Sequence, residues 1–246
     1  MTYLIDLDGK VILITGGTKG IGFATAKILA EAGAQVVIDD ILEPSEAQSL
    51  IACISGTPYK PYYIQKDISK EKNVEEMVEE VIDKFSFIDV LINNAGVLAD
   101  WDLSFAVHNK GLYYCSEKVL EYMVPRGAGK IINITSTCVF SGGTGYPQYV
   151  ATKGGVFSLT KYYARTYAPK GILVNGVMPA VVFSEMMLNR FESEKEMIDH
   201  YAPQMPIRRI GYPDDIAKVI LFLSSDLSDF ICGEVIVADG GRLSVG

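Results

Sequence analysis

The chain of 246 residues is poor in the residue types that several functional classes require. It has only two histidines, and no apolar run approaches the roughly 18 residues of a membrane-spanning helix. Two histidines cannot form a His-rich metal cluster, so we expect no metal site. The four cysteines are too scattered to suggest disulfides or zinc ligands, and they favour the reducing cytoplasm; they are Cys53, Cys115, Cys138 and Cys232. The first ten residues lack the basic, apolar pattern of a secretory signal, which agrees with a cytoplasmic location.

Positive charge is also scarce, because 22 lysines and arginines face 30 aspartates and glutamates, for a net charge of −8. An acidic surface repels phosphate backbones and anionic lipids, so we expect neither nucleic acid nor a membrane as a partner. It also disfavours an acidic carrier protein as the host of the substrate. The hydrophobic fraction of 49% excludes a disordered chain. A small-molecule substrate is therefore the expected partner.

Short β-branched runs alternate with amphipathic segments along the whole chain. The expected strands are 11–15, 35–39, 62–65, 90–93, 130–134, 173–178 and 234–238. The expected helices run from the glycines after the first strand to residue 32, then over 43–54, 70–85, 101–124, 149–167, 184–201 and 213–224. Seven buried strands separated by helices predict an α/β, doubly wound, parallel sheet with helices on both faces. The absence of a linker favours a single domain over residues 1–246.

A glycine-rich turn joins the first strand to the first helix in the segment TGGTKGIG, residues 15–22. Gly16, Gly20 and Gly22 permit a tight turn, close approach of the backbone to a pyrophosphate, and close packing of helix on strand. The N-terminus of the helix then offers N–H groups and a partial positive charge to the phosphates. The alternative is a glycine turn that binds no ligand.

The second strand ends in Asp39 and Asp40, about twenty residues after the glycines. An acidic side chain at this position binds the hydroxyls of the adenosine ribose and repels a 2′-phosphate, which predicts NAD and not NADP. Lys19 opposes this interpretation, because a cation near the ribose favours a phosphate. The alternative is that both carboxylates only end the strand.

The motifs, taken in order, resemble the short-chain dehydrogenase/reductase family in its compact form. They are the glycine turn, Asp67, the segment NNAG at residues 93–96, Ser136, Tyr149 with Lys153, Asn175 with Pro179, and the segment DGG at 239–241. The resemblance covers essentially the whole chain. It implies a seven-stranded Rossmann fold and hydride transfer between a nicotinamide dinucleotide and an alcohol or carbonyl.

The resemblance also implies which residues contact the cofactor. Asp67 and Ile68 are expected at the adenine, Asn94 at the ribose, and Val182 and Ser184 near the nicotinamide amide. The turn is expected to contribute Gly16, Lys19, Gly20, Ile21 and Gly22, and Asp40, Tyr149 and Lys153 complete the set.

The expected catalytic residues are Ser136, Tyr149 and Lys153. Residues four apart share one face of a helix, so Tyr149 and Lys153 point into one site. An ordinary tyrosine pKa of about 10 is too high for a base, and we expect the nearby ammonium to lower it. Ser136, at the end of a strand, is expected to hydrogen-bond the oxygen of the substrate.

The chain departs from the pattern of this family in three places. His108 stands where the family places an asparagine of the proton relay, and Asn109 beside it is rotated by about 100° on a helix. His108 is expected either to carry a proton near neutral pH or to be a packed histidine, with the second slightly favoured. The loop from Gly96 to Trp101 is short, and Ala180 replaces a glycine after Pro179, which brings strain if the position needs a positive φ.

These observations predict an NAD-dependent oxidoreductase acting on a secondary alcohol or ketone, such as a polyol, sugar or cyclic alcohol. The preference for a neutral substrate rests on the lack of an evident anion-binding cluster. The alternatives are an NADPH-dependent 3-oxoacyl-carrier reductase and a dinucleotide-binding regulator without turnover. The segment 183–206 is expected to form a lid over the substrate. The resemblance further implies a homotetramer, or else a homodimer.

Overall fold

A seven-stranded, entirely parallel sheet forms the centre of the computed structural model, which describes residues 5–143, 145–188, 191–243 and 245. The strand order is β3-β2-β1-β4-β5-β6-β7. The strands are β1 (Val11–Thr15), β2 (Gln35–Asp40), β3 (Tyr62–Gln65), β4 (Val90–Asn93), β5 (Gly129–Ile134), β6 (Ile172–Pro179) and β7 (Val235–Ala238). The order reverses between β1 and β4, and ligands of such sheets bind at the carboxyl ends of the strands beside this point.

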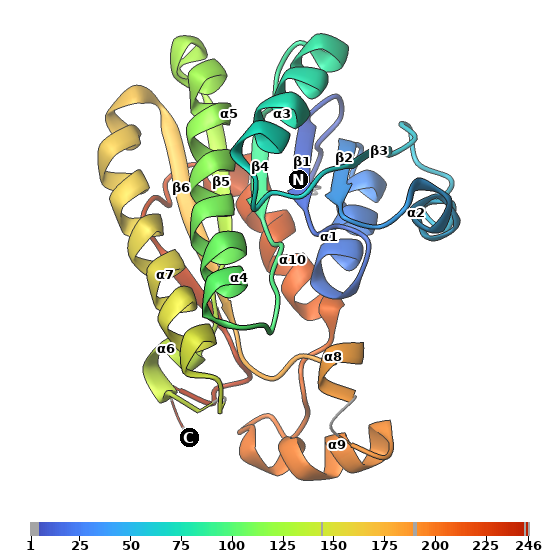
Figure 1. Cartoon of the computed structure of the whole chain (residues 1–246), viewed down its shortest axis with the longest axis vertical. Helices are drawn as coiled ribbons and strands as arrows, with labels where there is room; N and C mark the ends of the chain where they lie inside the picture. Colours follow the sequence, from blue (N-terminus) through green and yellow to red (C-terminus); the bar gives the residue numbers. More distant parts are fainter. Residues whose placement is uncertain (1–4, 144, 189–190, 244, 246) are drawn as a thin grey trace, which may run out of the picture.

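Helices cover both faces of the sheet, as the alternating pattern predicts (Figure 1). One face packs on α1 (Gly20–Glu31), α2 (Pro44–Ile51) and α10 (Pro213–Ser224). The other packs on α3 (Glu71–Phe85), α5 (Leu112–Arg126) and α7 (Pro147–Tyr167). Ile12 and Leu13, adjacent in β1, belong to different cores because successive side chains of a strand point to opposite faces. The expected doubly wound α/β fold is confirmed.

The helix expected over 101–124 is one rod with an irregular centre. It begins as α4 (Trp101–Phe105), widens into a π-helical turn over Ala106–Gly111, and continues as α5. The expectation that it stops at Pro125 is wrong, since α5 ends at Arg126 and Gly127 follows in the left-handed conformation. Proline at this position removes one N–H donor, but only the last helical turn is affected.

The expected helix over 184–201 is instead two short helices, α8 (Glu185–Leu188) and α9 (Glu194–Tyr201). Residues 189–190 between them lie outside the described part of the chain. This segment has a small core of its own, formed by Val181, Met197, Met205 and Ile210. A parallel bridge between Val182 and Gly211 joins it to the body.

Further short elements complete the chain. They are α6 (Cys138–Ser141), which the sequence did not predict, and the 3-10 turns Ala168–Lys170, Ala202–Gln204 and Asp226–Ser228. Of the helices in the described ranges, none is both long enough and apolar enough to cross a bilayer.

Candidate active site

The glycine-rich turn between β1 and α1 has the shape of a cradle for a pyrophosphate. Gly16 and Gly20 have positive φ angles of 65° and 51°, which side chains other than glycine rarely adopt. A Cβ atom at Gly22 would lie 2.1 Å from the carbonyl oxygen of Gly16. The three glycines are thus required by the backbone itself, and the turn fits the phosphates of a dinucleotide at the N-terminus of α1.

The side chain of Asn94 holds this turn in place. Its Nδ2 donates to the carbonyl oxygens of Gly16, at 2.8 Å, and Thr15, at 3.1 Å. The hydroxyl oxygen of Thr15 accepts hydrogen bonds from the backbone N–H groups of Asn94 and Ala95, each at 3.2 Å. The sequence does not predict this role of Thr15; its one indication is that a polar residue ends a buried strand. Asn94, expected at the ribose, therefore lies beneath the turn and ties it to β4.

Asp39 and Asp40 point to opposite faces of the sheet. Asp40 Oδ2 accepts the backbone N–H of Thr18 at 3.2 Å and its hydroxyl at 2.5 Å, so this carboxylate lies against the glycine turn. Asp39 is 1% exposed, and its burial raises the pKa of the carboxyl well above the usual value. Asp40, the carboxylate that the sequence analysis expects at the cofactor, therefore lies at the glycine turn, whereas Asp39 is buried in the sheet.

The remaining expected cofactor residues lie along the carboxyl edge of the sheet. Asp67 Oδ1 accepts the N–H of Ser69 at 3.0 Å and its hydroxyl at 2.6 Å, and these bonds lower the pKa of Asp67 against the effect of burial. Ile68 is buried, and a Cβ at Gly111 would come within 2.8 Å of it.

The four other expected cofactor residues lie at the start of α1 and shortly after β6. Lys19 is the N-cap of α1, and Ile21 in its first turn packs against the core. Val182 is buried at the bridge to Gly211, and the hydroxyl of Ser184 accepts the N–H of Met187 at 3.2 Å. All four therefore lie at the carboxyl edge of the sheet, where the cofactor is expected.

Ser136, Tyr149 and Lys153 come together at the ends of β5 and α7. Ser136 is close enough to Tyr149 for its hydroxyl to lower the pKa of the phenol. The Nζ of Lys153 lies 5.8 Å from the centre of the Tyr149 ring and donates to the carbonyl oxygen of Ile134 at 2.8 Å. One turn of helix α7 carries both side chains to the same side, as the spacing predicts.

The pKa of the phenol differs from the sequence-based expectation. Burial raises the pKa of Tyr149 to about 12, while the hydrogen bond from Ser136 acts in the opposite direction. Burial also lowers the pKa of Lys153 to about 8. Desolvation penalises the charged form of each group and is the largest cause of both shifts. Tyr149 is therefore held protonated at neutral pH.

Cys138, one of the four scattered cysteines, contacts the same group of residues. Its backbone N–H donates to the Ser136 hydroxyl at 3.3 Å. Burial raises the pKa of the thiol. Cys138 therefore stays a neutral thiol that supports Ser136.

His108 and Asn109 point in different directions from the π-helical turn. His108 is 2% exposed and faces the site, where burial and the charge of Lys153 lower its pKa to about 3. Asn109 faces α7, and its Nδ2 donates to the carbonyl oxygen of Thr152 at 3.0 Å. The alternative that His108 carries a proton near neutral pH is wrong, because the ring is a neutral, packed histidine.

The third departure from the family pattern has no structural cost. Among the described residues other than glycine, positive φ angles occur at Ser86 and Arg208. Ala180 is not one of them, so this position tolerates a side chain without strain.

Comparisons with known proteins agree with this geometry. A family model described as enoyl-(acyl carrier protein) reductase matches residues 16–242. The 3-oxoacyl-[acyl-carrier-protein] reductase FabG of Thermotoga maritima is 36% identical, over 96% of this chain and 98% of its own length. The chain belongs to the short-chain dehydrogenase/reductase family. It is accordingly an oxidoreductase whose family uses a nicotinamide dinucleotide.

Other relatives extend this similarity. The protein of the same name from Aquifex aeolicus is 34% identical, over 96% of this chain and 98% of its own length. Among solved structures, a putative gluconate dehydrogenase from Agrobacterium tumefaciens superposes with a TM-score of 0.92 at 28% identity, and both chains are covered completely. A putative short-chain alcohol dehydrogenase from Sinorhizobium meliloti gives 0.90 at 28% identity, with 98% and 99% of the two chains covered.

The expectation of a polyol, sugar or cyclic alcohol dehydrogenase is wrong. Relatives at 34–36% identity over most of the chain bear the name of 3-oxoacyl-carrier reductases. That expectation rested on the lack of an evident anion-binding cluster in the sequence. Members of this family share one fold and one set of catalytic motifs, so such a negative observation could not identify the substrate.

Proposed function

We propose that this short-chain reductase converts 3-oxoacyl thioesters to 3-hydroxyacyl thioesters. The observation that carries the proposal is the identity of 34–36% to 3-oxoacyl-[acyl-carrier-protein] reductases over 94–96% of the chain. The grouping of Ser136, Tyr149 and Lys153 supports it, because this grouping can bind and protonate a carbonyl oxygen.

Tyr149 is the proton donor in this proposal. Reduction of a ketone adds a hydride to carbon and a proton to oxygen, and the bound dinucleotide supplies the hydride. A phenol with a raised pKa stays protonated until the oxygen becomes basic. The raised pKa therefore keeps Tyr149 in the form that donates a proton, whereas the reverse oxidation would use the phenolate.

Ser136 and Lys153 position the reacting groups. The hydroxyl of Ser136 lies within hydrogen-bonding reach of the Tyr149 phenol, so both can contact one carbonyl oxygen. Lys153 is 5% exposed and, when protonated, places positive charge beside the phenol as it loses its proton. It is also suited to hold the ribose hydroxyls of the cofactor.

We assign NADH as the preferred cofactor because of Asp40. Its carboxylate is tied to Thr18 in the glycine turn, where a 2′-phosphate would meet negative charge. Replacing Asp40 with Asn keeps a hydrogen-bonding side chain but removes the charge. We expect this variant to bind NADPH more tightly relative to NADH by about tenfold or more in fluorescence titrations. An unchanged ratio, or a wild type that prefers NADPH, would contradict the assignment.

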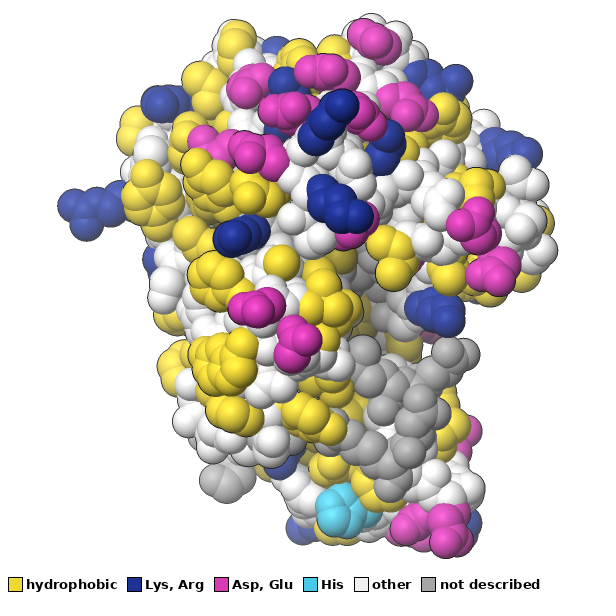
Figure 2. All heavy atoms as spheres, viewed as in Figure 1, with side chains coloured by type: hydrophobic (Ala, Val, Ile, Leu, Met, Phe, Trp, Pro, Cys, Tyr) yellow, Lys and Arg dark blue, Asp and Glu magenta, His cyan; other side chains and the backbone are white. Residues whose placement is uncertain are grey.

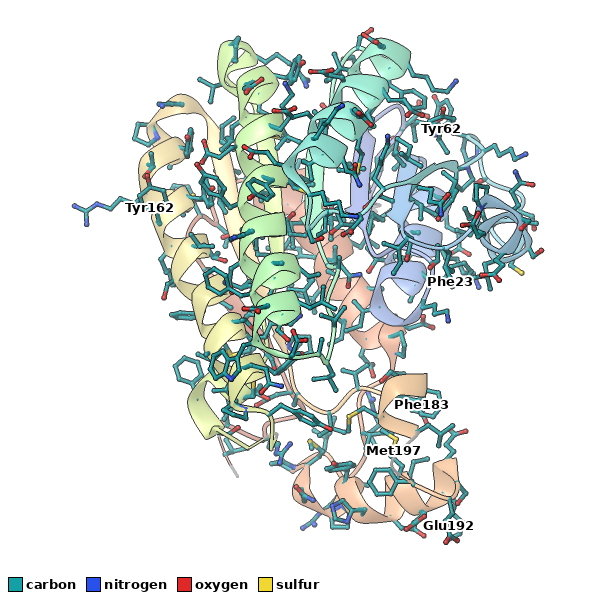
Figure 3. All side chains as sticks on the ribbon, in the orientation of Figure 1. Phe23, Tyr62, Tyr162, Phe183, Glu192 and Met197 are labelled. Atoms are coloured by element: carbon teal, nitrogen blue, oxygen red, sulfur yellow. The ribbon has the colours of Figure 1, made fainter. Side chains whose placement is uncertain are left out.

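An apolar lid fits an acyl chain better than it fits a sugar. Met197 and Met205 are buried in the small core of the segment 183–206, and Phe183 stacks on Tyr212 with ring centres 6.0 Å apart. Phe183 and Met197 lie in this segment below the body of the molecule (Figure 3).

The proposed reaction is tested by following NADH oxidation with acetoacetyl thioesters of coenzyme A, of N-acetylcysteamine and of acyl carrier protein. Turnover of these substrates, with weak or no turnover of gluconate and cyclic alcohols in the reverse direction, is the expected result. The opposite preference would refute the proposal. The three carriers also reveal whether the net charge of −8 disfavours an acidic carrier protein.

The same proposal includes the setting in which the enzyme works. The four cysteines are free thiols, which supports the reducing cytoplasm. Exposed aromatic side chains on α4, α5 and α7 support a homotetramer, since surfaces of this kind are usually covered in assemblies.

A further inference from the structure

His108 is a buried residue that the proposed reaction does not use, and both of its ring nitrogens have hydrogen-bond partners. It belongs to the π-helical turn between α4 and α5 and is 2% exposed. It lies between two parts of the site, the short loop over residues 96–100 and the first turns of α7.

Both ring nitrogens of His108 have a partner, and the partners fix the tautomer. Nε2 accepts the backbone N–H of Val97 at 2.9 Å, so this nitrogen carries no proton. Nδ1 lies 2.8 Å from the hydroxyl of Thr152, which itself donates to the carbonyl oxygen of Gln148 at 2.8 Å. The hydroxyl has only one proton to donate and must accept from His108. The ring is therefore neutral, with its proton on Nδ1.

His108 and the loop that it holds lie beside Tyr149 and Lys153. The His108 ring meets the Tyr149 ring edge-on, with centres 5.5 Å apart. A Cβ atom built at Gly96, next to Val97, would lie 3.2 Å from His108 Nε2 and 3.7 Å from Lys153 Nζ. The part of the loop that is hydrogen-bonded to His108 therefore packs beside the ammonium group of Lys153. Gln148 holds the same loop further along, since its Nε2 donates to Ala99 O at 2.7 Å.

We propose that His108 is a positioning residue, whose neutral ring fastens the loop 96–100 to α7 and keeps the ammonium group of Lys153 out of water. The inference rests on the proposed function, because it assigns His108 a part in the same site. If this part of the loop moved away, water would reach Lys153, and its pKa would return toward the ordinary value of lysine.

The first test examines the ring itself and needs no substrate. The chain contains only His108 and His200, so ¹⁵N NMR of the imidazoles has two residues to assign, and a His200→Gln variant assigns them. We expect His108 with a proton on Nδ1 alone and no titration between about pH 5 and pH 8. A proton on Nε2, or titration in that range, would overturn the inference.

The second test measures the loop by hydrogen exchange. His108→Leu removes both hydrogen bonds and keeps an apolar side chain, and we expect the amide of Val97 to exchange about tenfold faster or more. Val81→Ala is the matched control, because Val81 is fully buried in α3, away from this site, and the variant loses stability without touching the loop. Equal exchange at Val97 in His108→Leu and wild type would refute the role.

The third test separates positioning from stability by kinetics. For His108→Leu we expect kcat to fall about tenfold or more, with the NADH dissociation constant within about twofold of wild type. His108→Gln offers an acceptor and a donor and is expected to recover most of kcat, and Val81→Ala is expected to keep it. A kcat in His108→Leu within about twofold of wild type would contradict the inference. A wild type inactive on 3-oxoacyl thioesters would refute the proposed function instead, and the NMR and exchange results would still decide on His108.

Discussion

At the scale of single residues, the fold places neighbours in the sequence in different surroundings. Asp39 is buried and its pKa is raised, whereas Asp40 accepts hydrogen bonds at the surface of the glycine turn. The period of two along β2 sends one carboxyl into the sheet and the other toward the cofactor edge. A similar contrast separates His108, which faces the site, from Asn109, which faces α7.

Tyr149→Phe is expected to abolish turnover and to spare cofactor binding. The variant lacks only the phenolic hydroxyl, so the proton donor is lost while the ring still fills its place. We expect kcat to fall by about 10²–10⁴-fold. NADH titration by fluorescence provides the control and should give an unchanged dissociation constant. Near-normal turnover would remove Tyr149 from the reaction.

His108 is expected to make stability depend on pH in the acid range. Its pKa is about 3 in the folded protein and about 6.5 unfolded, so between these values only the unfolded chain binds the proton. The contribution to stability is therefore full above about pH 6.5 and is lost as the pH falls toward 3. Between about pH 7 and pH 5 the loss amounts to about 2 kcal/mol.

Urea unfolding of wild type and His108→Gln at the two pH values measures this contribution. The variant has no titrating ring at this position, so its stability should fall less over the interval by about the stated amount. Equal pH dependence in the two proteins would mean that His108 titrates normally in the folded state.

At the scale of elements, α7 organises the site because one continuous helix presents three of its residues. Tyr149, Thr152 and Lys153 lie within two turns, and Lys153 and Thr152 are buried against β5 and the π-helical turn. The close approach of that turn depends on Gly155, where a Cβ would lie 2.3 Å from Asn109 Nδ2. At Gly154, the next residue back, a Cβ would meet nothing within 4 Å.

The two glycines give a matched pair of variants. Gly154→Ala should raise the free energy of unfolding by up to about 1 kcal/mol, because alanine loses less conformational freedom in a helix. Gly155→Ala should lower it by about 1–3 kcal/mol, because the new methyl group displaces the amide of Asn109 from Thr152. Urea unfolding measures both, and equal effects would show that the helix contact is not as close as described.

At the scale of the whole molecule, the sheet and its two helical layers form the body, and the segment 183–206 packs around a separate small core. Charged side chains gather at the end of the molecule near α3, whereas hydrophobic side chains appear over α4, α5 and α7 (Figure 2). The exposed aromatic residues on these helices include Trp101, Phe105, Tyr113 and Tyr162. A face of this kind is suited to contact another copy of the chain.

A charged substitution on this face tests the assembly. We expect wild type to be a tetramer in light scattering and Phe105→Glu with Tyr113→Glu to give smaller species, because burying two carboxylates in an interface is unfavourable. Ile41→Glu is the control, because Ile41 is also exposed but follows β2, near the opposite edge of the sheet. This variant should leave the mass unchanged. A monomeric wild type would contradict the proposed homotetramer.

The alternation of strands and helices, the glycine turn and the Tyr149–Lys153 spacing were determined by the sequence alone. They follow from local rules, since periodicity sets the faces of helices and strands, and a tight turn requires glycine. The family motifs predicted a candidate site at the ends of β1, β4 and β5, and the structure brings Ser136, Tyr149 and Lys153 together there. The sequence could not choose the substrate, because the same motifs occur with different substrates.

Only the tertiary structure decided that Asp39 is buried, how His108 is bonded, and in which direction the pKa of Tyr149 moves. Each depends on contacts between residues far apart in the chain, such as Val97 and His108 with Thr152. The spacing of Tyr149 and Lys153 was visible in the sequence, but the burial that shifts both pKa values was not. Desolvation is a property of the packed interior and acts only once β5, α7 and the short loop have come together.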